Sequence, residues 1–135
     1  MKDLMNYEPK KNNRFLVEFP ERFGIHPHSI KKISKPKFTD GKWENIRVDF
    51  IDFIGPSTSQ KLFNIVEFLK KNESEDKKLF DIKIKSLDPI DVVVEEWLVL
   101  VEKVLTINFG ELNYGDDGMQ QIYLILKPLN CILKF

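Results

Sequence analysis

Cysteine and long apolar runs are both scarce in this 135-residue sequence, where Cys131 is the single cysteine. One cysteine excludes an internal disulfide framework and is compatible with a reducing compartment. A helix needs about 20 consecutive apolar residues to cross a bilayer, and no run approaches that length. The first residues also lack the apolar core of a signal peptide. We therefore expect a protein that is made in the cytoplasm and has no membrane partner.

An excess of either charge is also missing, because Lys plus Arg and Asp plus Glu both number 21. Without a net charge, no global field draws the chain toward nucleic acid or an anionic membrane. A net charge near zero also does little to keep copies of the chain apart.

Sequence motifs for catalysis and cofactor binding are absent as well. There is no Gly-rich phosphate loop, no cysteine pair, no helical His-Glu metal spacing and no Gly-x-Ser-x-Gly elbow. His26 and His28 flank Pro27 without a third ligand nearby, so a solvated turn is favoured over a metal site. We expect neither a metal nor another cofactor.

Two carboxylate pairs remain as candidates for acid–base chemistry. Glu95 and Glu96 are adjacent in an expected strand, so their side chains point to opposite faces and cannot share one proton or water. Asp116 and Asp117 lie in the sequence GDDG, where Asp and Gly serve turn geometry. With no catalytic residue identified, we expect a protein that is not an enzyme.

The length of the chain is typical of one domain. Residues 1–13 are polar and without a hydrophobic period, and we interpret them as a flexible N-terminal arm, with docking on a neighbouring subunit as the alternative. Residues 14–135 then form a single β-barrel domain.

Alternating apolar and polar residues predict a mainly β fold, a sandwich or barrel of about six to eight mostly antiparallel strands. The expected strands cover residues 14–19, 30–38, 43–54, 79–86 and two runs within 96–135. One flanking helix is predicted near residues 57–71, with Ser57 as N-cap and Gln60 completing a capping box. Its apolar stripe comprises Leu62, Phe63, Ile65, Val66 and Leu69.

Several of these strands are apolar on both faces. In residues 121–126, Ile122, Leu124 and Leu126 share one face, while Tyr123 and Ile125 lie on the other. In residues 104–109, Leu105, Ile107 and Phe109 are expected on one face, opposite Val104, Thr106 and Asn108. A sheet with one face in water is not built this way. One short helix cannot cover every apolar surface, which favours a second chain as the cover.

A basic segment occupies residues 30–38, with Lys31, Lys32, Lys35 and Lys37 around Pro36. Proline confines such a segment to an edge strand or an irregular loop, and lysines protect an edge from unwanted pairing. The segment is either a protected edge or a patch that pairs with an acidic surface. The alternative, from a different class of function, is a small oligonucleotide-binding β-barrel that uses these lysines.

The order of these elements and the C-terminal residues resemble the tail tube protein family of contractile-tailed bacteriophages. The matching residues are Glu96, Trp97 and Leu98; then Ile107, Phe109, Gly110, Glu111, Leu112 and Tyr114; then Ile122, Leu124 and Leu126. Upstream, Asn13, Arg14, Phe15 and Val17, the 43–53 strand and the 57–71 helix occur in the same order as in that family.

The resemblance implies a virion structural protein that forms homohexameric rings by joining sheets edge to edge. Stacked rings would make the tail tube, a conduit for DNA ejection inside a contractile sheath, with sheath and baseplate proteins as partners. DNA would pass through the lumen transiently and without sequence recognition. Type VI secretion tube proteins and baseplate tube-initiator proteins share the fold, so an initiator or tail-terminator ring is the alternative role.

This hypothesis assigns roles to eight outward-facing residues. Ile51, Phe53, Tyr123 and Ile125 are expected at subunit interfaces, and Arg47, Asp49, Lys83 and Lys85 on a solvent or lumen face.

Overall fold

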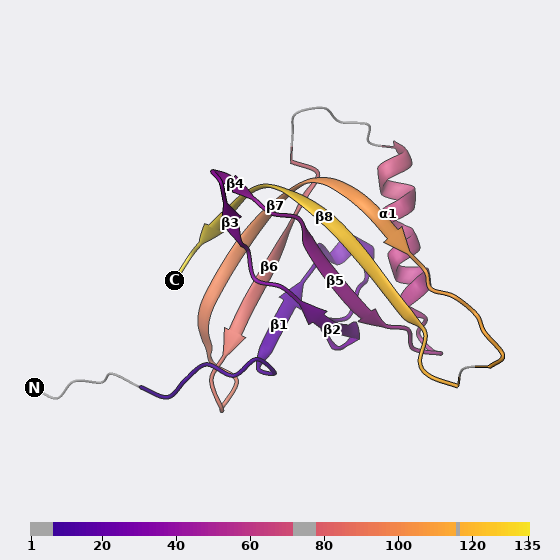
Figure 1. Ribbon diagram of the computed structural model, residues 1–135, viewed down its shortest axis with the longest axis horizontal. Coiled ribbons are helices and arrows are strands. Elements are labelled where there is room, and N and C mark those ends of the chain that lie inside the picture. The colour runs from indigo at the N-terminus through magenta and orange to yellow at the C-terminus, as the bar shows by residue number, and fades with distance from the viewer. Residues whose placement is uncertain (1–6, 72–77, 116) are drawn as a thin grey trace, which may run out of the picture.

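The computed structural model describes residues 7–71, 78–115 and 117–135, which form one strongly curved antiparallel sheet, a separate two-stranded hairpin and a single α-helix (Figure 1). The six strands of the sheet are ordered β1-β6-β7-β8-β5-β2. Their bounds are β1 Phe15–Glu18, β2 Ile30–Ile33, β5 Ile46–Ile51, β6 Phe80–Leu87, β7 Val93–Asn108 and β8 Gln121–Leu133. The sheet curls into a nearly closed barrel, which confirms the predicted mainly β fold with one helix.

The long ladder between β7 and β8 produces most of this curvature. It runs from the pair Trp97–Leu133 to the pair Asn108–Tyr123, and its register shifts three times. Such bulges bend a strand and increase its twist, so the two strands form an arch over the molecule (Figure 1).

One of these bulges also corrects the predicted faces of residues 104–109. It lies between Val104 and Thr106, and both Val104 and Ile107 pack against the core while Leu105 is exposed. Strict alternation placed Leu105 and Ile107 on the same face. An extra residue in one strand reverses the alternation beyond it, so that assignment is wrong.

The strand predicted for residues 43–54 is also wrong in its bounds. Lys42–Trp43 (β4) pairs instead with Phe38–Thr39 (β3) in a separate hairpin, and β5 covers only Ile46–Ile51. Asp40 and Gly41 turn the chain with positive φ angles of 51° and 76°. The chain therefore returns to β3 at this turn before β5 begins.

The helix α1 spans Thr58–Lys71, as predicted. Ser57 Oγ accepts the backbone N–H of Gln60 at 3.3 Å, which is one half of the expected capping box. The carboxylate of Asp52 provides a second cap, because it accepts the backbone N–H of Ser59 at 3.1 Å and its hydroxyl at 2.7 Å. An anion near a helix N-terminus also interacts favourably with the helix dipole.

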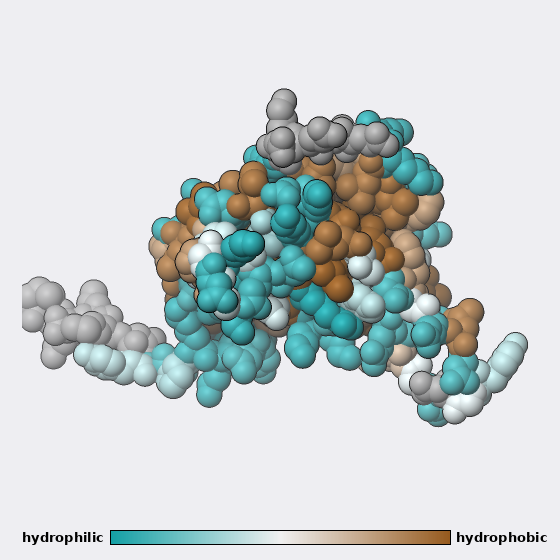
Figure 2. All heavy atoms as spheres, turned by 45° about the horizontal axis from the view of Figure 1, so that its top comes forward, coloured by the Kyte–Doolittle hydropathy of each residue, from teal (hydrophilic) through white to brown (hydrophobic). Residues whose placement is uncertain are grey.

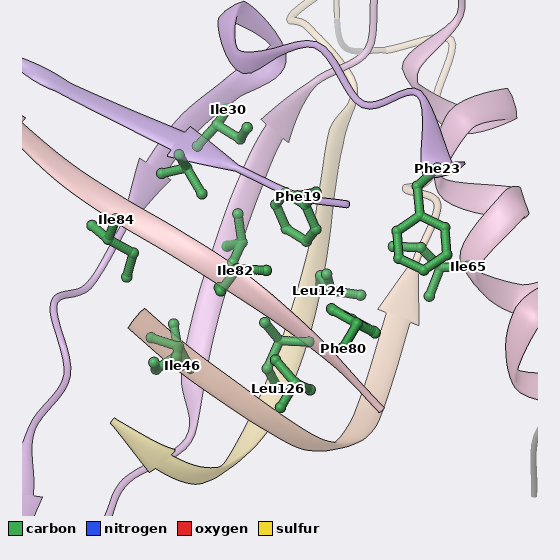
Figure 3. Packing of buried hydrophobic residues seen from close by; sticks show 14 of the residues in the cluster. Phe19, Phe23, Ile30, Ile46, Ile65, Phe80, Ile82, Ile84, Leu124 and Leu126 are labelled. Carbon is green, nitrogen blue, oxygen red and sulfur yellow. The ribbon is translucent and has the colours of Figure 1, made fainter. Parts of the chain in front are cut away.

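The hydrophobic core fills the interior of the curved sheet, and α1 packs against it (Figure 3). Leu62 and Ile65 of α1 are fully buried there. The ring of Phe23, from the short 3₁₀ helix Glu21–Phe23, contacts Phe68 edge to face at 5.5 Å between centroids. Phe63, assigned to the apolar stripe, is instead 45% exposed. Phe68, which the predicted stripe did not include, packs against Phe23.

We predict that Phe23→Ala destabilises the protein by about 3–5 kcal/mol, because the substitution leaves a cavity at a side chain that is 1% exposed. Phe63→Ala removes the same atoms from an exposed position of α1 and should cost less than about 1 kcal/mol. Urea denaturation followed by circular dichroism measures both values. Equal losses for the two variants would contradict the packing described.

Candidate functional site

The outer face of β5 and β8 carries most of the residues assigned to an interface or a lumen. Arg47 lies opposite Ile125, Asp49 opposite Tyr123 and Ile51 opposite Gln121 in the antiparallel register. The interface group and the charged group therefore share one face on these two strands, where sequence reasoning had treated them as separate surfaces. Phe53 follows β5 and is 43% exposed.

Arg47 connects the two groups directly. Its guanidinium lies 3.0 Å from the Asp49 carboxylate and stacks over the Tyr123 ring at 3.8 Å from the centroid. Guanidinium groups stack well on aromatic faces, and this contact holds the tyrosine against the sheet. The result is a mixed surface in which charge and aromatic area alternate.

Lys83 and Lys85 lie on the outer face of β6, away from the buried Ile82 and Ile84. Lys85 forms an ion pair with Glu18 of β1 at 3.1 Å. Lys83 is exposed. The charged residues therefore lie on the outer face in two places, on β5 and on β6, which are separated in the sheet by β7 and β8.

An apolar surface lies on the outside of the β7–β8 arch, and we call it the outer arch. It comprises Leu98, Leu100, Leu105, Ile125 and Ile132. Leu105 is 47% and Ile132 is 37% exposed. Figure 2 shows hydrophobic surface over this arch, interrupted by hydrophilic side chains. Helix α1 packs on the interior of the sheet and leaves this outer face uncovered.

The barrel is open between its two edge strands, β1 and β2, and we call this opening the seam. In the part of the chain that the structure describes, neither strand pairs with the other. A hollow of about 380 Å³ lies between them, and Phe15, Ile33 and Ile84 contribute apolar lining. Six cationic side chains line it as well: Lys10, Lys11, Arg14, Lys31, Lys32 and Lys35.

Glu95 joins the two sides of the seam. It lies on the inner face of β7 and is 8% exposed. Its carboxylate accepts hydrogen bonds from Lys10, which precedes β1, from Lys35, which follows β2, at 2.8 Å, and from the Trp97 indole at 2.9 Å. One buried carboxylate therefore connects segments from opposite edges of the sheet.

The surroundings of Glu95 act on its pKa in opposite directions. Burial alone would raise the pKa, because a charged carboxylate loses water. The hydrogen bonds from Lys10, Lys35 and Trp97 together outweigh burial and lower the pKa from its ordinary value of 4.5 to about 2. Glu95 is therefore ionised at neutral pH, in a position where it bridges two ammonium groups.

Sequence reasoning missed this bridge, although it correctly placed Glu95 and Glu96 on opposite faces. A signal was present, because the alternation that buries Val99 and Val101 also points Glu95 inward. The partners could not be found in the same way, since Lys10 and Lys35 lie 85 and 60 residues away in the sequence.

The remaining candidates for chemistry are the two histidines, Cys131 and the carboxylates of the GDDG sequence. The rings of His26 and His28 stack at 4.8 Å, and His26 Nδ1 accepts the backbone N–H of His28. Among the described residues, no three His, Cys, Asp or Glu side chains are grouped to hold a metal. Burial raises the pKa of the Cys131 thiol to about 11, so it is protonated at neutral pH. Asp116 lies outside the described residues, and Asp117 is exposed.

Among the described residues, the α-helix Thr58–Lys71 is too short and too polar to cross a bilayer.

We predict that Glu95→Gln lowers the free energy of unfolding by about 1–3 kcal/mol at pH 7, because it removes two charge-assisted contacts across the seam. Folding lowers the pKa of Glu95, so the ionised group stabilises the folded state above pH 4.5, and this contribution is lost as the pH falls toward about 2. The difference between wild type and variant should therefore shrink over that range in urea denaturation.

Glu96→Gln is the matched control, since Glu96 neighbours Glu95 but faces outward and forms no ion pair with the described residues. Its effect should be small and should not follow the same pH dependence. A Glu95→Gln effect that stays constant between pH 7 and pH 2 would overturn the role assigned to the bridge.

Comparison with known proteins gives fold relatives only. No family model matches the sequence, and no curated protein does. A chain of the cryo-EM structure of the anti-feeding prophage (AFP) tube terminating cap superposes with a TM-score of 0.67 at 15% identity, over 98% of this chain and 95% of that one. A chain of the PVC sheath-tube complex, from an extracellular contractile injection system in its extended state, gives a TM-score of 0.65 at 13% identity. The match covers 95% of this chain and 93% of that one.

A chain of the 6-fold symmetrised AFP baseplate gives a TM-score of 0.60 at 15% identity, over 95% of this chain and 97% of that one. Identities this low establish the fold and nothing finer. The chain therefore has, over nearly its whole length, the fold of chains found in solved structures of contractile particles.

Proposed function

We propose that this protein is a structural, non-enzymatic subunit of a contractile tail, which forms hexameric rings that stack into the tail tube. The observation that carries the proposal is the near full-length fold match to chains from a baseplate, a sheath-tube complex and a terminating cap. In this role the protein resides in the virion, its partners are other copies of itself and the sheath and baseplate proteins, and DNA passes through the lumen without recognition.

The surface of the barrel supports assembly with further copies. The outer arch leaves apolar side chains uncovered, and exposed apolar surface that gathers on one face often marks a protein–protein contact. The edges of β1 and β2 have no strand partner in the described residues. Joining edges across a closed ring removes exposed strand edges, which otherwise invite aggregation.

The ring model places Ile51, Phe53, Tyr123 and Ile125 at contacts between subunits. Ile51, Tyr123 and Ile125 lie on one outer face of β5 and β8, which supports this assignment, and the exposed Phe53 follows β5. Arg47 and Asp49 neutralise each other on the same face, so they add no unpaired charge to an interface there. In this model Lys83 and Lys85, on β6, face solvent or the lumen.

A baseplate tube-initiator ring or a tail-terminator ring is the alternative role within the same fold. The match to the AFP tube terminating cap supports it as directly as the sheath-tube match supports the tube subunit. The two roles differ in one property, because a tube subunit adds rings on both sides while an initiator or terminator stops at one.

The oligonucleotide-binding barrel has less support. Two of the four lysines in residues 30–38 are engaged, because Lys35 pairs with Glu95 at 2.8 Å and Lys37 lies 3.9 Å from Glu44. If the barrel nevertheless binds nucleic acid, single-stranded DNA will show an affinity that falls steeply with salt. Absence of binding at low salt removes this function.

We predict that concentrated purified protein forms six-fold rings or tubes in negative-stain electron microscopy. Long tubes would support the polymerising subunit, and single rings would support the initiator or terminator. A protein that stays monomeric at high concentration and also fails to assemble on isolated baseplates would contradict the proposed function.

We predict that Ile125→Asp abolishes this assembly while the variant remains folded, because it introduces a charge at a half-buried outer position. Lys83→Asp changes an exposed residue on the solvent or lumen face and serves as the control, with assembly retained. Circular dichroism verifies the fold of both variants. Normal assembly of the Ile125→Asp variant would show that Ile125 does not lie at a subunit interface.

A further inference from the structure

The loop between β7 and β8 projects apolar side chains away from the barrel. Leu112 is 86%, Tyr114 112% and Met119 69% exposed, although large apolar residues are usually at least partly covered. Neither strand of the hairpin covers them, since β7 ends at Asn108 and β8 begins at Gln121. In Figure 1 this loop, in orange, extends beyond the strands on the right of the view. We call its described residues, 109–115 and 117–120, the hairpin loop.

The hairpin loop lies in the most one-sided stretch of charge in the sequence. Between Lys103 and Lys127 there is no Lys or Arg, while Glu111 and Asp117 are acidic and exposed. The described part of the loop is therefore acidic. An acidic surface on one copy attracts a basic surface on another copy, and such complementarity sets the orientation of the contact. Within one copy, Gly118, Met119 and Gln120 at the end of the loop line a hollow together with Lys31 and Lys32.

The seam, in contrast to the acidic loop, is lined by positively charged side chains. Lys11, Lys31 and Lys32 line it and are exposed, and none of them forms an ion pair with a described carboxylate. Glu95 occupies two further lysines, so its charge is already balanced by Lys10 and Lys35. The cations on the rim therefore remain available, above an apolar lining formed by Phe15, Ile33 and Ile84.

The size of the seam also limits what it accepts. Its volume of about 380 Å³ lies at the lower end of the range for protein binding pockets, about 300–1,000 Å³. That volume suits one or two large side chains at the end of a loop, and it excludes a folded domain. The occupant must combine apolar side chains with carboxylates, which is the composition of the hairpin loop.

We propose that the hairpin loop of one copy docks into the seam of the next copy, in a head-to-tail contact. Leu112 and Tyr114 cover the apolar lining, and Glu111 and Asp117 pair with Lys11, Lys31 and Lys32. A contact between two different surfaces of the same chain is heterologous, so it repeats from copy to copy and builds rings or stacks. This inference rests on the proposed function in one respect, since it identifies the surfaces through which the copies associate.

Charge reversal tests the pairing. Lys31→Glu with Lys32→Glu, and separately Glu111→Lys with Asp117→Lys, should each weaken self-association at least tenfold in sedimentation velocity. Mixing the two double variants should restore association, because the reversed loop then meets the reversed seam. Lys42→Glu with Lys103→Glu changes the same number of exposed lysines outside the seam and should leave association unchanged. Equal association of all variants, or no recovery on mixing, overturns the inference.

Disulfide trapping tests the geometry independently of assembly. We expect a Leu112→Cys variant mixed with a Lys32→Cys variant to yield a disulfide-linked heterodimer under mild oxidation, while the buried Cys131 remains unreactive. The matched control replaces Lys32→Cys with Lys42→Cys and should yield no such dimer. A disulfide within one copy of the Leu112→Cys/Lys32→Cys double variant would show that the loop closes on its own seam, and would overturn the contact between copies.

The outcomes separate the two proposals. Rings without the cross-link overturn the docking of the hairpin loop and leave the proposed function standing. The cross-link without rings or tubes, alone or on baseplates, supports the docking and overturns the proposed function.

Discussion

The structure depends on the bending of one pair of strands. β7 and β8 pair over almost their entire lengths, and only their bulges allow a ladder this long to curve over the core. The curvature places Ile82, Val99 and Leu124 from three strands in the same interior, where each is fully buried. Since a twisted six-stranded sheet needs strong coiling to approach closure, the opening between β1 and β2 is what remains after the bend.

Ion pairs connect the two edge strands, β1 and β2, which are not paired by backbone hydrogen bonds in the described residues. Glu95 holds Lys10 and Lys35 across the opening, and the hydrogen bonds from these lysines and from Trp97 outweigh burial and hold its pKa low. Removing a partner is costly, because it leaves a buried carboxylate without compensation. The bridge thus divides the lysines of the seam into Lys10 and Lys35, which pair with Glu95, and Lys11, Lys31 and Lys32, which form no ion pair with a described carboxylate.

The position of α1 explains why apolar surface remains outside the barrel. The described residues contain one α-helix, α1. Its residues Leu62 and Ile65 are buried in the same core as Phe23. The helix therefore completes the core and leaves the outer arch uncovered. The uncovered apolar area on the arch and, among the described residues, the unpaired edges at the seam are the surfaces that the proposed assembly of copies would use.

Local patterns in the sequence determined the type of most elements, the cap of α1, and the inward faces of β6 and β8, because these depend on alternation and on residues a few positions apart. The limits of β4 and β5 and the faces of β7 beyond Val104 depended on tertiary structure, since a turn and a bulge shift the pattern without a strong local signal. The ion pairs of Glu95 required the closed sheet, which brings residues 10, 35 and 95 together from three distant segments. Sequence alone therefore specified most strands and the presence of apolar residues on both of their faces. The curvature of the sheet decided which charged groups form ion pairs and which apolar side chains lie on the outer face.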